Sequence, residues 1–125
     1  MTLEDLRLPD RSAALKALHG SEEHLEKVVE EFCAEAPKTL HRVANLLMHR
    51  ETNRSRYEIR KLRCQSSVFF SQSTSDLLAS YEQQLRDDSS AGDVFDQFHD
   101  VSKHVTELIR QLKKWYGEDG GFGGN

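Results

Sequence analysis

Apolar residues recur at spacings of three and four along most of the chain, which is the period of an amphipathic helix. The longest such stripe begins after Ser21, a residue suited to capping a helix, and continues to Met48. It passes Pro37 without a change of phase, so it predicts one long helix that is kinked at the proline. No convincing strand alternation accompanies these stripes, and the fold class that we predict is all-α.

Shorter patterns flank this long helix. A helix over about 10–18 precedes it, with Asp10 as its cap and Gly20 at the left-handed position that ends it. Towards the other end of the chain, apolar residues repeat at threes and fours over 95–115, and Asp93 can cap that last helix. Each of these helices thus has a residue suited to its start.

Two more helices lie between them, joined by polar connections. We expect a turn over 51–53 and then a helix over 54–71. The run from Ser73 to Asp76 resembles a capping box, with Asp in place of the usual Glu, and opens a helix that ends before the loop over 87–92. Four amphipathic helices with short connections predict an antiparallel four-helix bundle, with a short extra helix at its N-terminal end.

The length of 125 residues gives room for one compact domain with a genuine core. We expect residues 1–9 to form a lead-in and residues 10–116 to form the helical bundle. Five of the seven glycines fall in the last nine residues, so residues 117–125 are expected to be a disordered tail.

The segment over 54–71 separates two kinds of side chain when it is placed on a helical wheel. The side predicted to be buried carries Ile59, Leu62, Ser66, Phe69 and Phe70. Because adjacent residues on a helix point in different directions, one of the two phenylalanine rings can reach the surface. The side predicted to be exposed carries three arginines, a thiol and a hydroxyl: Arg56, Arg60, Arg63, Cys64 and Ser67.

Composition narrows the functional classes. The net charge of −4 argues against general nucleic-acid binding, although a local basic face can still act. No apolar run approaches the 18 residues of a membrane span and no signal pattern opens the chain, so we predict a cytoplasmic protein without membrane contact. The two cysteines, a core-like Cys33 and a surface-like Cys64, do not make a disulfide framework.

No pattern predicts a catalytic, metal or cofactor site. A di-iron bundle needs paired Glu-x-x-His motifs, and the nearest match is a single run from Asp96 to His99. A glycine-rich phosphate loop, a Ser-His-Asp order and zinc-spaced cysteines are not evident. We therefore predict a protein that is not an enzyme and needs no metal or cofactor.

Three stretches carry a resemblance to a known family. The runs over 14–21 and 28–37, in front of the helix over 54–71, resemble the opening of histidine phosphotransfer (HPt) domains. The HPt signature is an exposed His followed by x-Leu-Lys-Gly and two small residues, and the matching run here is 60–66. Leu62 fits the Leu, Arg63 stands for the Lys, Cys64 replaces the Gly and Arg60 replaces the phosphorylatable His.

The resemblance covers about 10–116 and implies a bundle that docks onto response-regulator receiver domains or histidine kinases. The replacement at Arg60 implies that the relay itself is lost, because a guanidinium stays protonated and cannot accept a phosphoryl group. The leading hypothesis is a non-catalytic adaptor that acts by occupancy and competes with a working phosphotransfer protein. The residues expected to bind the partner are Arg56, Arg60, Lys61, Arg63, Cys64, Ser67 and Phe70.

Other interpretations stay open at this point. A relay protein could use one of the six histidines at another position, or the bundle could bind a partner unrelated to phosphorelays. The three arginines could equally be a solvated helix face. Cys64, one turn from Arg60, could sense redox state, although a passive replacement for the family's Gly explains it more simply.

Overall fold

The computed structural model describes residues 9–87 and 91–116, except for the side chains of residues 91–93. Its regular elements are all helices. No strand occurs within these ranges, so the all-α prediction is confirmed. The elements in order are α1 (Arg11–Ala17), α2 (Glu22–Met48), α3 (Thr52–Ser66), the 3₁₀ turn η2 (Ser67–Phe69), α4 (Gln72–Arg86) and α5 (Ala91–Lys114).

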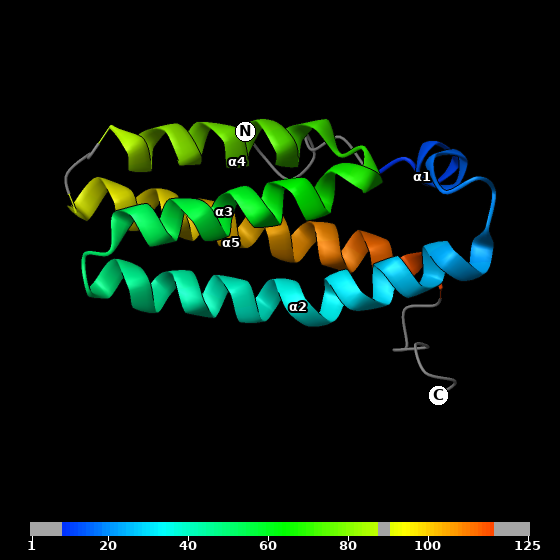
Figure 1. Cartoon of the computed structure of the whole chain (residues 1–125), viewed down its shortest axis with the longest axis horizontal. Helices are drawn as coiled ribbons and strands as arrows, with labels where there is room; N and C mark the ends of the chain where they lie inside the picture. The colour runs from blue at the N-terminus through cyan, green and yellow to red at the C-terminus, as the bar shows by residue number, and fades with distance from the viewer. Residues whose placement is uncertain (1–8, 88–90, 117–125) are drawn as a thin grey trace.

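The four long helices lie lengthwise beside one another, and α1 sits at one end (Figure 1). Each long helix packs against two others: α3 lies between α2 and α4, and α5 closes the set by contacting both α2 and α4. The core runs between them and draws fully buried side chains from all four and from η2. The largest of these are Tyr81, Phe69, Leu25, Ile59, Leu62, Leu78 and Leu112. Among the described residues, no helix is both long and apolar enough to cross a membrane.

The starts of α1 and α2 agree with the sequence. Asp10 Oδ1 accepts a hydrogen bond from Ala13 N at 3.0 Å, and Ser21 Oγ accepts one from His24 N at 3.1 Å. Gly20 adopts the left-handed conformation with φ 79°, and the preceding residue His19 shares it with φ 59°. The predicted caps and the predicted turn between these helices are therefore confirmed.

The long helix is also confirmed, because α2 continues from Glu22 to Met48 with Pro37 inside it. At ~1.5 Å per residue its 27 residues extend for about 40 Å. Pro37 removes one backbone hydrogen bond, but the apolar positions before and after it stay on one side of the helix. Burial of these side chains keeps the helix continuous through the proline. Helix α2 contacts α1, α3 and α5.

The prediction of one helix over 54–71 is wrong at both ends. The helix begins earlier, at Thr52, after a left-handed residue at Arg50 with φ 59° completes the reversal from α2. It ends at Ser66, and a 3₁₀ turn leads to a second left-handed residue, Phe70, with φ 57°. Serine hydroxyls compete with backbone donors here: Ser66 Oγ donates to Arg63 O at 3.1 Å and Ser67 Oγ to Cys64 O at 2.7 Å.

This early ending corrects the predicted buried face. Ile59, Leu62, Ser66 and Phe69 are buried, as expected, but Phe70 is 51% exposed. The left-handed backbone at Phe70 turns its ring away from the core that holds Phe69. Of the two adjacent rings, Phe70 is the one that reaches the surface.

Two predicted helix starts are also wrong. Helix α4 begins at Gln72 with Ser71 as its N-cap, whereas Ser73 lies buried inside the helix. The hydroxyls of Ser71 and Thr74 lie 3.0 Å apart, and this contact replaces the expected capping box. Helix α5 begins at Ala91, before the predicted cap at position 93. The predicted tail over 117–125 and most of the lead-in over 1–9 lie outside the described residues.

Phe69 links several segments at this end of the molecule. Its centroid lies 5.2 Å from that of Phe32 and 6.2 Å from that of Trp115, both in edge-to-face geometry. Its carbonyl oxygen accepts a hydrogen bond from Asp10 N at 2.9 Å. One residue of η2 therefore contacts α2, the residue that follows α5 and the cap of α1.

Replacing Phe69 by alanine should lower the free energy of unfolding by about 3–5 kcal/mol, because it leaves a cavity among packed rings. The matched control is Phe70→Ala, which should change it by less than about 0.5 kcal/mol, since half of that ring is already exposed. Urea denaturation followed by circular dichroism measures both. Equal losses for the two variants would contradict this account of the η2 turn.

Candidate functional site

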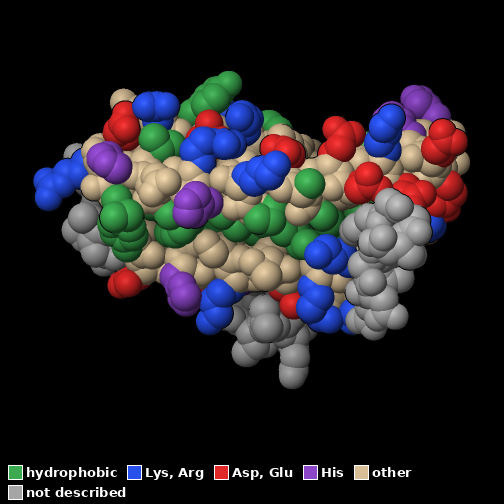
Figure 2. Space-filling view, turned by 90° about the horizontal axis from the view of Figure 1, so that it is seen from below, with side chains coloured by type: hydrophobic (Ala, Val, Ile, Leu, Met, Phe, Trp, Pro, Cys, Tyr) green, Lys and Arg blue, Asp and Glu red, His purple; other side chains and the backbone are tan. Residues whose placement is uncertain are grey.

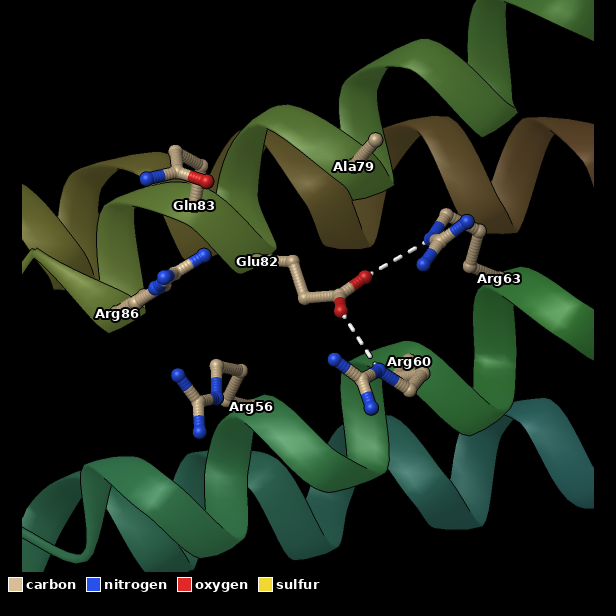
Figure 3. A pocket seen from close by; sticks show the side chains of 7 residues that line it. All are labelled: Arg56, Arg60, Arg63, Ala79, Glu82, Gln83 and Arg86. Carbon is tan, nitrogen blue, oxygen red and sulfur yellow. Dashed lines mark hydrogen bonds and ion pairs between the residues drawn. The ribbon is translucent and has the colours of Figure 1, made fainter.

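A hollow of about 530 Å³ opens between α3 and α4. Arginines at positions 56, 60 and 63 share one side of α3, because spacings of four and three bring helical residues into line. The same rule places Glu82 and Arg86 together on α4. We name this hollow the arginine groove; Figure 3 shows its lining residues, Arg56, Arg60, Arg63, Ala79, Glu82, Gln83 and Arg86.

Glu82 is the centre of the groove's hydrogen bonds. Arg60 Nε donates to its Oε1 at 2.9 Å, and Arg63 Nε donates to its Oε2 at 2.8 Å. Only 10% of the Glu82 side chain is exposed. Burial alone would raise the pKa of this carboxyl, but the hydrogen bonds from Arg63 and Arg60 outweigh it and hold the pKa below its ordinary value. The bond to Glu82 raises the pKa of Arg63 in turn.

The arginines differ in how much of their charge remains available. The side chain of Arg60 is 61% exposed and that of Arg63 is 37% exposed, so both reach water beyond their contact with Glu82. Arg56 and Arg86 lie across the groove from one another, on α3 and α4, without an ion pair among the residues drawn (Figure 3). Neither forms an ion pair with any other described residue. Four arginines and one glutamate give the groove a formal charge of +3.

The seven residues expected to bind a partner divide into two groups. Arg56, Arg60 and Arg63 line the groove together, whereas the other four lie outside it. The expectation that the three arginines form an exposed face is right for Arg60 and needs correction for Arg56 and Arg63. Arg60 and Arg63 are tied to Glu82, and Arg56 and Arg63 are half-buried beside α4.

The other four predicted residues face elsewhere. The ammonium group of Lys61 lies 3.6 Å from Glu58 Oε1 and 5.9 Å from the centroid of the Tyr57 ring. Cys64 and Ser67 are exposed, and Phe70 is half-exposed where the chain leaves α3. These side chains form the outward surface beside the groove and do not line it.

Sequence reasoning missed Glu82 and Arg86. Glu82 follows the buried Tyr81 in an amphipathic helix, where a solvated carboxylate is the ordinary expectation. Its partners are 22 and 19 residues earlier in the chain, so no local spacing connects them. Only the packing of α3 against α4 brings these charges together.

The face drawn in Figure 2 carries side chains of both charges. Figure 2 shows hydrophobic side chains along the middle of one face, with charged side chains of both signs around them. A smaller hollow of about 250 Å³ between α2 and α3 is lined by Val28, Glu31, Phe32, Glu35 and Gln65. Its charged residues are both carboxylates, so its charge is opposite in sign to that of the arginine groove.

The cysteines and histidines lie outside the arginine groove. Cys33 is half-buried against the core, as predicted, and burial raises the pKa of its thiol to about 11. Burial likewise lowers the pKa of His104. Within the described residues, no three His, Cys, Asp or Glu side chains gather where they could hold a metal ion.

Comparison of the chain with protein-family models, curated proteins and solved structures gives no match. The resemblance to HPt domains therefore rests on the sequence alone, on the runs over 14–21 and 28–37 and on the motif frame over 60–66. The function that the resemblance implies is a proposal, and the geometry of the arginine groove is its physical support.

Replacing Glu82 by glutamine removes the charged acceptor of two hydrogen bonds and should lower the free energy of unfolding at pH 7. The loss should be only about 1 kcal/mol, because solvent screens the charges of the two partly exposed arginines. Folding lowers the pKa of Glu82, so its contribution is fully present above the unfolded value of about 4.3. It is lost as the pH falls through the lower folded pKa. Urea denaturation at pH 7 and near pH 2 measures the difference between the two proteins.

The control is Glu35→Gln, which removes an exposed carboxylate that lies 3.5 Å from Lys38 Nζ. It should leave stability nearly unchanged at both pH values. If Glu82→Gln destabilises the protein equally at both pH values, the lost interaction is not that of the ionised carboxylate.

Proposed function

We propose that the protein is a non-catalytic pseudo-phosphotransfer adaptor of two-component signalling. It binds the receiver domain of a response regulator, or a histidine kinase, and regulates by occupying the surface that a working phosphotransfer protein needs. In this proposal the four long helices are an antiparallel four-helix bundle of the HPt kind, and the protein acts in the cytoplasm. The observation that carries it is Arg60, a 61% exposed guanidinium at the position of the family's phosphorylatable His.

The chemistry of Arg60 supports binding without transfer. A phosphoryl relay needs a nitrogen with a lone pair that can attack and later leave near neutral pH. A guanidinium offers donors only, and here its Nε already donates to Glu82. Among the described residues nothing else bonds to it, so its terminal amino groups can meet a partner.

The charge of the groove supports an acidic partner. HPt domains dock near the phosphorylation pocket of a receiver, where acidic residues surround a metal site. A groove with a formal charge of +3 complements such a pocket, and arginine forks match carboxylates in geometry. Complementary potentials also raise the rate of encounter and disfavour partners with basic surfaces.

The outward residues of α3 supply the rest of the proposed docking surface. Phe70 presents a half-exposed ring at the end of the helix, where an apolar contact can exclude water. Lys61, Cys64 and Ser67 would form the polar border between that ring and the arginines. Cys64 also places a side chain where the family has none, one turn from Arg60.

Arg60→Ala should weaken binding of a receiver domain by at least about tenfold, because it removes a charge-assisted contact from the centre of the interface. The protein and its variant are first used to capture partners from an extract of the native cells, with identification by mass spectrometry. Titration calorimetry with the purified receiver domain then measures the affinity. The matched control is Arg54→Ala, which removes the same charge from α3 at a side chain that is 72% exposed and outside the groove.

Receiver-containing proteins should bind the parent and the control and be lost with Arg60→Ala. Incubation with a phosphorylated receiver should leave no acid-labile, base-stable phosphate on the protein. Unchanged affinity after Arg60→Ala would overturn the proposed docking mode. Stable labelling of a histidine would favour a working relay instead.

A further inference from the structure

The arginine groove holds more positive charge than its own carboxylate can neutralise. Glu82 is directed to Arg60 and Arg63, each of which bonds to one of its oxygens. Figure 3 shows Arg56 and Arg86 on the other side of Glu82, without an ion pair among the residues drawn. Two guanidinium groups from different helices therefore face a shared space with no described anion between them.

Two like charges in this arrangement repel each other, and a bound anion would convert the repulsion into attraction. Guanidinium groups present planar forks of donors that pair with phosphate oxygens. Arg60 is one turn from Arg56 on α3, so its exposed terminal amino groups can contribute to the same ligand. We infer that the groove binds a diphosphate group, held mainly between Arg56 and Arg86 with Arg60 beside them.

Charge and space favour a diphosphate over a smaller anion. A carboxylate carries one charge and a phosphate monoester about −1.5 to −2 at pH 7, so either leaves the groove positive. A diphosphate group brings more charge, and its two phosphorus centres can meet arginines on both helices. The hollow of about 530 Å³ is within the range of small-molecule sites.

The lining also indicates which part of a ligand the groove recognises. Apart from the charged residues it presents only Ala79 and Gln83, so it has no aromatic ring on which a nucleobase could stack. The recognised chemistry is therefore the diphosphate itself, with any organic substituent left in solvent. Adenosine diphosphate should bind about as well as inorganic pyrophosphate.

This inference concerns the protein alone and does not depend on the proposed function. If a receiver also docks at Arg60, a diphosphate ligand would compete with it and so regulate docking. The two statements can fail separately. Receiver binding that is absent while pyrophosphate still binds overturns only the proposed adaptor role, and the reverse result overturns only the diphosphate site.

The test is calorimetric titration of the whole chain with sodium pyrophosphate at low ionic strength. Arg56→Ala and Arg86→Ala should each weaken binding by about tenfold, which is the effect of losing one strong charge-assisted contact. Neither variant should lower the midpoint of thermal unfolding, because neither side chain forms an ion pair with another described residue and each loss relieves repulsion between like charges. Arg54→Ala, which removes an equal charge outside the groove, should change the affinity by less than about twofold.

Equal weakening by Arg54→Ala would mean that pyrophosphate responds only to overall charge. Undetectable binding by the parent at low ionic strength would exclude the site. A much higher affinity for adenosine diphosphate than for pyrophosphate would show that the nucleoside, and not the diphosphate, is recognised.

Discussion

The hydrogen bonds of Arg60 and Arg63 to the Glu82 carboxylate are the interaction that organises the α3–α4 side of the molecule. This carboxylate is nearly buried, and removing a carboxylate from water is unfavourable unless donors replace the water. Arg60 and Arg63 supply those donors at 2.9 and 2.8 Å and so connect α3 to α4 across a polar seam. The same bonds decide which charges stay available: the outer part of Arg60, together with Arg56 and Arg86.

Much of the fold could be predicted from local physics. The period of apolar positions is strong enough to predict α2 through Pro37, and short side-chain caps at Asp10 and Ser21 determine where helices begin. Prediction failed where serines give the backbone alternatives of similar energy, as at Ser66. There the packing of Phe69, far from its partners in sequence, decides the outcome.

The candidate site could be predicted only in part. Helical spacing is enough to align Arg56, Arg60 and Arg63, but a wheel of one helix cannot tell solvent from a neighbouring helix. Glu82 and Arg86 enter the site through tertiary packing alone. A net charge of −4 for the whole chain also conceals a local charge of +3, because a total does not show where the charges lie.

The structure shows a helical scaffold that presents paired and unpaired arginines in a groove between α3 and α4, and the proposed function takes this groove as the docking surface for a receiver domain. The most direct test of that proposal is a heteronuclear NMR titration that follows the arginine Nε–Hε signals while a captured receiver domain is added. The account predicts that the signals of Arg56 and Arg60 shift and that the signal of Arg54 does not. Shifts confined to arginines outside the groove, with Arg60 unchanged, would contradict it.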